Sequence, residues 1–321
     1  MQTNKATVVC SMRNEGPFLV EWVAWYRWLG FTDLVVVTNN CTDHSPELLD
    51  ALETAGWVHH VRHDVAPGLK ITDRKLDAVK AHPAVEGADW VMVCDVDEFL
   101  VIHVGEGRLP DLIAPHVGPD GEARILGMSI NWRVFGTSGR TRFEDVPVHR
   151  QFLKACGPDH PLSRNVKSIF RCPDWFEKLR PHGPRGLVLA RADRAWGQPG
   201  MQWIMADGRP LEEWQPDGEY LRRVGQDLVG FGVAQMNHYM LRSVETFTLK
   251  AGTPSPAALK DRYTQRYFDR ANQGDQFDDS ALRHGGAWEA VFREAMSLPE
   301  VARLHDLCCE DHRRMIALRR A

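Results

Sequence analysis

Short apolar runs alternate with helical patterns over the first third of the chain. The runs long enough for buried strands cover residues 7–12, 34–38, 57–61 and 89–94. Apolar residues at helical spacing predict helices over 17–29, 45–52 and 72–81. We expect Gly30 to end the first helix and Ser45 to be the N-cap of the second. This alternation predicts an α/β fold, in which helices cover both faces of a mostly parallel sheet.

The rest of the chain is less regular. Its middle is rich in Pro, Gly, Arg and Trp, with strand-like runs at 125–130 and 166–170. The C-terminal part is helical and ends in an amphipathic segment near 298–318. Because no repeat and no low-complexity linker separates these parts, we expect one main domain over 1–250 and a helical extension over 251–321 packed on it.

Composition narrows the class of protein. The 321 residues carry a net charge of −4, whereas nucleic-acid-binding domains are usually strongly basic. No run reaches the roughly 18 apolar residues of a membrane helix, and the N-terminus lacks the pattern of a secretory signal. The seven cysteines show no paired spacing, which suits reduced thiols. We therefore expect a cytoplasmic protein with no nucleic-acid partner and no transmembrane segment.

Charge is unevenly distributed along the chain. Residues 131–200 carry a net charge of +7, so the remainder carries −11. A local basic field in an acidic chain suits a small anionic ligand better than a duplex.

A cluster of acids follows the fourth predicted strand. The run 89–94 leads directly into Asp95, Asp97 and Glu98, at the strand end where such sheets bind ligands. In an extended segment residues i and i+2 point to one face, so we expect the Asp95 and Asp97 carboxylates to lie side by side. Neighbouring carboxylates repel unless a cation lies between them. Such hard oxygen ligands suit Mg²⁺ or Mn²⁺, which commonly bridge nucleotide phosphates.

This acidic segment, Asp-Val-Asp-Glu-Phe-Leu, resembles the D-x-D element of glycosyltransferases with the GT-A fold, and in particular the bacterial family 2-like glycosyltransferases. Four further segments resemble other blocks of that family in the same order. They are Cys-Ser-Met-Arg-Asn-Glu at 10–15, Asn-Trp-Arg-Val-Phe-Gly-Thr-Ser-Gly at 131–139, Lys-Ser-Ile at 167–169, and the block from His238 to Lys250. The resemblance implies a Rossmann-like GT-A domain over 1–250 that transfers a sugar, with inversion, from a nucleotide-diphosphate sugar to an acceptor hydroxyl.

The same resemblance implies roles for individual residues. Mn²⁺ or Mg²⁺ would be held by Asp95, Asp97 and His238. The donor would contact Arg13, Asn14, Glu15, Asn39, Asp43, Arg74 or Lys75, Asp95, and Lys250 or Arg242. The acceptor side would include Trp132, Phe135 and Gly136.

The resemblance is less specific about the substrates. A UDP-sugar is the default donor because it is the commonest donor for this resemblance, and a GDP-sugar is the alternative. Asn39-Asn40 stand where family 2 enzymes commonly have paired acids, so the base stays open. The acceptor would be a glycan or another hydroxyl compound, and a lipid-linked acceptor would be met by peripheral membrane contact. An inverting transfer also needs a general base for the acceptor hydroxyl. The nearest substitutes for the family's acidic block are Asp174, Glu177 and His182, and the choice among them stays open.

Other interpretations compete with sugar transfer. A phosphohydrolase would use the first Asp of such a pair as nucleophile, and a nucleotidyltransferase that makes sugar nucleotides would share the fold. A nucleotide- or glycan-binding protein that has lost catalysis would also keep it. Finally, His305, Cys308, Cys309 and His312 share one helical stripe. One straight helix cannot easily surround a zinc ion, so we interpret this stripe as a packing face with buried thiols.

Overall fold

The computed structural model describes residues 5–66, 69, 71–216, 218, 221–252 and 261–320. Its strands are β1 (Ala6–Met12), β2 (Asp33–Thr38), β3 (His59–Arg62), β4 (Trp90–Val93), β5 (Glu98–Ile102), β6 (Ile125–Val134), β7 (Lys154–Ala155), β8 (Val166–Arg171), β9 (Phe176–Arg180), β10 (Gly183–Leu187), β11 (Gln202–Met205), β12 (Ala234–His238) and β13 (Gln276–Phe277). Its α-helices are α1 (Gly16–Leu29), α2 (Ser45–Thr54), α3 (Ile71–Lys80), α4 (Pro83–Glu86), α5 (Leu109–Ile113), α6 (Val148–Gln151), α7 (Val244–Lys250), α8 (Gln265–Ala271), α9 (Gly285–Ser297) and α10 (Val301–Arg320).

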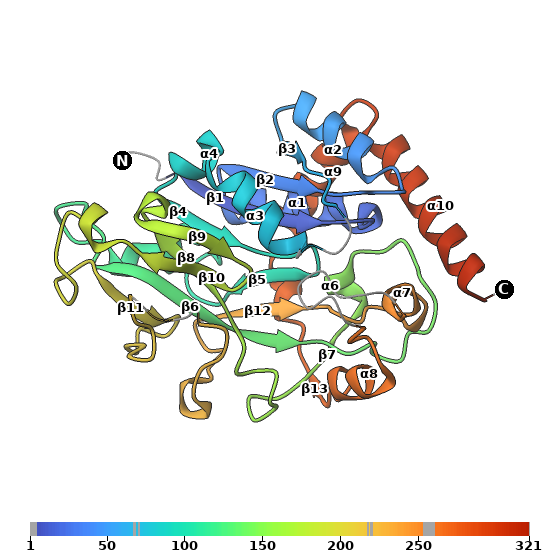
Figure 1. Ribbon diagram of the computed structural model, residues 1–321. Coiled ribbons are helices and arrows are strands. Elements are labelled where there is room, and N and C mark those ends of the chain that lie inside the picture. Colours follow the sequence, from blue (N-terminus) through green and yellow to red (C-terminus); the bar gives the residue numbers. More distant parts are fainter. Residues whose placement is uncertain are drawn as a thin grey trace.

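A nine-stranded mixed sheet forms the centre of the molecule (Figure 1). Its order is β3-β2-β1-β4-β8-β6-β12-β5, and β11 pairs with β6 beside this path. The first four strands are parallel to one another, whereas β8 runs antiparallel to both β4 and β6. The predicted α/β class is therefore confirmed. The parallel strands β1, β2 and β4 end at the same edge of the sheet, where a site can form.

Helices cover both faces of this sheet and create two apolar cores. One core contains α1, in which 13 of the 14 residues are buried, and the other contains apolar side chains of α3 and α4. A helix that is apolar almost all round must be buried. Its one buried acid, Glu21, lies 2.7 Å from Nδ1 of His149. The prediction of Ser45 as an N-cap is wrong: His44 holds that position, and Ser45 is the first helical residue.

The C-terminal helices pack on the N-terminal part of the fold. Helices α9 and α10 both contact α1, and α10 also contacts α2 and α7 (Figure 1). Strand β13 pairs with β7, so this part also contributes a small strand. The boundary predicted at residue 250 stays a prediction. Among the residues that the structure describes, no helix is long and apolar enough to cross a membrane.

Candidate active site

A cavity of about 760 Å³ opens where β1, β2, β4 and β12 end. The loops that follow these strands supply its floor, and α7, α8 and α10 supply much of its wall. Of the residues predicted from the sequence, those that line it are Arg13, Asn14, Glu15, Asn39, Lys75, Asp95, Asp97, Trp132, His182, His238, Arg242 and Lys250. The fold thus gathers side chains that are up to 237 positions apart into one concave site.

The D-x-D segment is a tight turn between β4 and β5. The backbone N–H of Glu98 donates to the carbonyl of Asp95 at 3.0 Å, which closes the turn. The expectation that this segment is extended is therefore wrong, whereas both carboxylates do line the same cavity. Asp95 Oδ2 lies 3.2 Å from Nζ of Lys167, and Asp97 Oδ2 lies 3.2 Å from Nζ of Lys250. Each carboxylate has its own lysine, so the two differ in environment.

Asp97 is the more enclosed of the two acids. Its side chain is 12% exposed, against 43% for Asp95. Burial alone would raise the pKa of Asp97, but the charges of Lys250 and His238 outweigh that effect and hold the pKa well below its usual value. The Asp97 carboxylate is therefore ionised at physiological pH.

His238 reaches the turn through strand pairing. In the antiparallel pair of β12 and β5, His238 lies opposite Glu98, the residue after Asp97. Its Nε2 lies 3.4 Å from Asp97 Oδ1, and its ring packs edge-on against Trp132. The structure thus brings together His238 and Asp97, two of the three predicted metal ligands.

A buried lysine forms ion pairs with two acids of the turn. Lys167 on β8 is fully buried and lies 2.7 Å from Oε2 of Glu98, in addition to its contact with Asp95. Burial works to lower the pKa of Lys167, but the two carboxylates raise it above its usual value. The ammonium group stays charged and fixes one side of Asp95.

The buried Arg242 forms one wall of the cavity. Its guanidinium lies 3.5 Å over the ring of Phe18, and Nη1 donates to Glu15. Its Nε and Nη2 are buried and have no hydrogen-bond partner among the described residues. Unsatisfied buried N–H groups are costly, so a cavity wall that carries two of them is suited to an anionic ligand.

The loops after β1 and β2 are held together by short polar contacts. Asn14, at φ +55°, donates to Thr42 Oγ1 and accepts from the Thr42 backbone N–H. Lys75 on α3 donates to Asn39 Oδ1 at 2.7 Å and to the carbonyl of Met12. Burial lowers the pKa of Lys75 to about 8. Lys75 lines the cavity, whereas Arg74 is exposed on the same helix.

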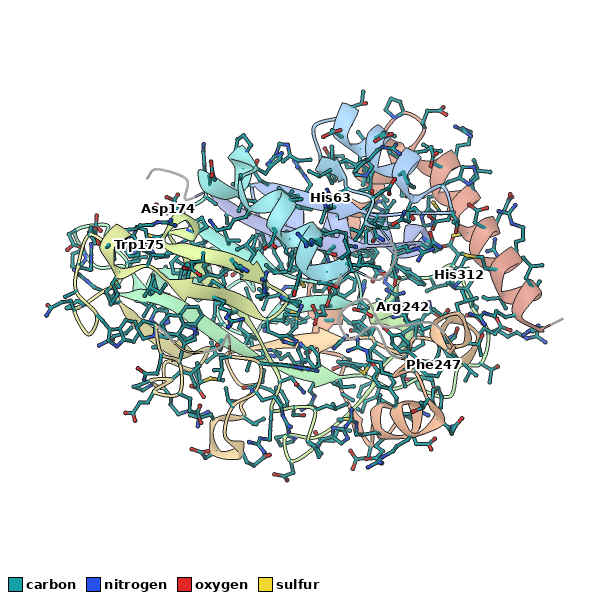
Figure 2. All side chains as sticks on the ribbon, in the orientation of Figure 1. His63, Asp174, Trp175, Arg242, Phe247 and His312 are labelled. Carbon is teal, nitrogen blue, oxygen red and sulfur yellow. The ribbon has the colours of Figure 1, made fainter. Side chains whose placement is uncertain are left out.

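Six of the predicted site residues lie elsewhere. They are Asp43, Arg74, Phe135, Gly136, Asp174 and Glu177. Asp43 is buried and accepts hydrogen bonds from the backbone N–H and hydroxyl of Ser45 at the start of α2. Phe135 packs on Tyr239. Asp174 lies near one end of the molecule, whereas Arg242 lies nearer its middle (Figure 2).

Glu177 and Gly136 also have local surroundings that explain their positions. Glu177 is exposed on β9. A Cβ at Gly136 would come within 2.8 Å of Asn272 Oδ1, so this glycine allows a close approach of the chain. Neither residue lines the cavity.

The cavity is strongly basic, but its charges do not come from the basic segment 131–200. That segment is described throughout, and none of its Lys or Arg residues lines the cavity. The described lining residues include eight Lys or Arg against three acids, the cations being Arg13, Lys75, Arg222, Arg242, Lys250, Arg262, Arg270 and Arg319. Such an excess of one charge raises the local concentration of an anionic ligand.

Sequence reasoning missed the C-terminal contribution to the site. The residues it missed include Arg222, Arg262, Tyr263, Tyr267, Arg270, Met315, Leu318 and Arg319. Tyr263, just before α8, and Tyr267, within it, are four positions apart; this is a weak signal, because the same spacing is common on packing faces.

The donor atoms at the turn fit a divalent cation. Carboxylate and imidazole are ligands that Mn²⁺ accepts, and Asp97 is ionised. His238 Nδ1 and Glu98 Oε1 are buried without hydrogen-bond partners among the described residues. A different cluster of potential metal ligands is more compact. In the described part of the chain, one atom each of Asp145, His305 and Cys309 lie within 4.8 Å of one another, outside the cavity.

The chain is similar to parts of known glycosyltransferases. No protein-family model matches it. A glycosyltransferase family 92 protein of Oryza sativa subsp. japonica is 31% identical over 139 residues, which are 42% of this chain and 22% of that protein. One of Arabidopsis thaliana is 34% identical over 94 residues, 28% of this chain and 16% of that protein. The aligned part is thus less than a quarter of each relative's length.

Similarity to solved structures is partial. A crystal structure of S. aureus TarS matches 52% of this chain and 47% of that chain, with 15% identity and a TM-score of 0.32. Glucosyl-3-phosphoglycerate synthase from Mycobacterium tuberculosis, in complex with Mn²⁺, UDP and glucosyl-3-phosphoglycerate, matches 40% and 44%, with 18% identity and a TM-score of 0.26.

Proposed function

We propose that this chain is a metal-dependent, inverting glycosyltransferase that uses a nucleoside-diphosphate sugar. The observation that carries the proposal is the D-x-D turn at the edge of a basic cavity of about 760 Å³, a size that accommodates such a donor. The names of the curated relatives favour glycosyl transfer over nucleotidyl transfer.

In this proposal the diphosphate lies between the turn and the basic wall. Asp97, with Asp95 and His238, would hold Mn²⁺ or Mg²⁺. The ion, when bound, stabilises the charge that develops on the leaving diphosphate. Arg242 would donate its two unpartnered N–H groups to phosphate oxygens, and Lys250 lies beside the turn at 3.2 Å from Asp97.

The nucleoside would lie against the loops after β1 and β2. Asn14, Asn39 and Lys75 present amide and ammonium groups there, which can recognise a base or a ribose by hydrogen bonding. A UDP-sugar is the first donor to test and a GDP-sugar the second.

The acceptor would be an anionic hydroxyl compound. Arg222, Arg262 and Arg270 form no ion pair with a described residue, and they line the cavity together with Trp132. Their charge exceeds what one diphosphate neutralises, and Trp132 Nε1 is buried without a described partner. An acceptor that carries a phosphate or carboxylate would complement them.

His182 is our candidate for the general base. Of the three predicted bases, it is the one that lines the cavity. Its Nδ1 lies 2.8 Å from the carbonyl oxygen of Val166, which favours the tautomer protonated at Nδ1. Burial, helped by the charge of Lys167, lowers the pKa of His182 well below its usual value. The ring is therefore in its neutral form at physiological pH.

A thermal-shift titration tests the donor site. UDP, GDP, CDP and dTDP are each added with Mn²⁺ and with EDTA, since ligand at one hundred times Kd stabilises the folded state by about 2.7 kcal/mol. We expect one nucleotide to raise Tm with Mn²⁺ and not with EDTA. Asp97→Asn should abolish this shift, whereas the matched change Asp174→Asn, outside the cavity, should preserve it. A metal-dependent shift that persists in Asp97→Asn would refute the role of Asp97.

A further inference from the structure

The cysteine- and histidine-rich stripe of α10 divides into two halves in the structure. Cys308 packs tightly against the start of α1, where a Cβ at Gly16 would meet its sulfur at 2.4 Å. His312 lies between Phe18 and Phe143. These two residues form the packing face expected from the sequence. His305 and Cys309, one turn apart, point in another direction.

His305 and Cys309 meet an acid from outside the helix. Asp145 lies in the loop between β6 and α6, and its Oδ1 is 3.0 Å from Nε2 of His305. The same Nε2 is 3.7 Å from Sγ of Cys309. The loop therefore supplies a ligand from outside the helix, on a side of the ion that one straight helix could not reach.

The separations among these three atoms are those of a metal site. Zinc binds sulfur at about 2.3 Å and nitrogen or oxygen at about 2.0–2.2 Å, which places tetrahedral ligands about 3.4–3.6 Å from one another. The observed 3.0 Å and 3.7 Å lie close to these values, and all three ligand atoms lie within 4.8 Å of one another. Small side-chain adjustments would admit an ion.

The arrangement does not suit a nucleophilic triad. In a Cys-His-acid relay the two ring nitrogens serve different partners, whereas here Nε2 faces both Asp145 and Cys309. His305 Nδ1 is buried without a partner among the described residues. In addition, the Cys309 side chain belongs to a residue that is only 1% exposed, so substrates cannot reach it.

We propose that Asp145, His305 and Cys309 form a second metal site, which binds Zn²⁺ or a similar borderline-soft divalent cation. Thiolate, imidazole and carboxylate are a common zinc donor set. The fourth ligand would be water, because the Asp145 side chain is 38% exposed and opens the site to solvent. The ion would tie the β6–α6 loop to α10. This site does not depend on the proposed sugar transfer, because no cysteine is among the described residues that line the cavity with the D-x-D turn.

Cobalt substitution tests this site directly. Co²⁺ is titrated into the purified 321-residue chain after chelator treatment, and absorption from thiolate-to-cobalt charge transfer is recorded. We expect this absorption to reach a plateau that corresponds to one thiolate-bound Co²⁺ per chain, and Zn²⁺ to abolish it by displacement. Cys309→Ser should abolish the absorption. The matched control Cys308→Ser, which changes the adjacent thiol on the packing face, should retain it.

A second variant covers the case in which Cys309→Ser does not fold. Asp145→Asn changes a half-buried loop side chain and should lower Co²⁺ affinity by at least about tenfold. The proposal is overturned if the wild-type protein shows no thiolate absorption, if the absorption survives Cys309→Ser, or if Asp145→Asn binds Co²⁺ as tightly as the wild type.

Discussion

Replacing Arg242 with Met isolates the contribution of the buried guanidinium to donor binding. The residue is 2% exposed and stacks on Phe18, and Met has a similar length and a sulfur that also packs well on an aromatic ring. Arg242 has a positive φ of 54°. Met carries the same Cβ, so the substitution leaves backbone strain unchanged.

The expected loss of affinity follows from the two unpartnered N–H groups. A hydrogen bond to a charged group contributes about 1.5–3 kcal/mol, so two such bonds to a diphosphate contribute about 3–6 kcal/mol. At 1.4 kcal/mol per factor of ten, the lower limit corresponds to a loss of roughly 100-fold in affinity. Stability should change by less than about 2 kcal/mol, because removing unsatisfied buried donors offsets the lost contact with Glu15.

Isothermal titration of the nucleotide identified by thermal shift, with Mn²⁺ present, measures this loss. Arg133→Met is the matched control, since Arg133 is also buried, stacks 4.5 Å over Phe231 and pairs with Asp278, outside the cavity. We expect the control to lose stability and to keep its affinity. If Arg242→Met bound the nucleotide within threefold of the wild type, the two N–H groups would have no role in donor binding.

Two further predictions concern histidines of the cavity. If the ring is the general base, His182→Gln should lower kcat by roughly 10²–10⁴-fold and leave nucleotide affinity unchanged. Steady-state kinetics and calorimetric titration measure the two quantities. An unaltered kcat would show that His182 is not the general base. His312→Gln should make the protein less sensitive to acid. Burial lowers the pKa of His312 to about 3, so the unfolded chain takes up this proton near pH 6.5 while the folded protein does not. The stability associated with a neutral His312 is complete above pH 6.5 and falls by about 1.4 kcal/mol per pH unit between pH 6.5 and 3. The free energy of unfolding is measured with urea at pH 7 and at pH 4. Between these two pH values, the stability of His312→Gln should fall by about 3 kcal/mol less than that of the wild type. Equal falls in the two proteins would contradict the assignment.

Strong hydrophobic patterns made most of the fold predictable. The runs at 7–12, 34–38 and 89–94 became β1, β2 and β4, and the Trp-rich helix became α1 within one residue of its predicted start. These elements are buried, so their periodicity reports their surroundings directly. Because their order fixes which strand ends meet, the sequence also indicated that the acids after β4 lie near the residues after β1.

Side-chain contacts across the sheet were not predictable. That Asp97 contacts Lys250 depends on the pairing of β12 with β5, which connects segments more than 130 residues apart. Asp43 shows the opposite error. An acid after a strand can face a ligand, or it can accept hydrogen bonds from the start of the next helix. Asp43 does the second, because the Ser45 hydroxyl lies within hydrogen-bond distance of its carboxylate.

Helix α10 connects the two proposed sites through its rigidity. His305 and Cys309 face the β6–α6 loop, while His312, Met315 and Arg319 of the same helix line the cavity. At 1.5 Å per residue, about 15 Å of helix separates His305 from Met315. An ion at Asp145 would restrain the cavity wall without contacting a substrate. Loss of that ion should therefore weaken nucleotide binding only slightly in Cys309→Ser, whereas Asp97→Asn should abolish metal-dependent binding altogether. If Cys309→Ser instead abolished that binding while remaining folded, donor binding would depend on the ion at Asp145, and the two sites would not be independent.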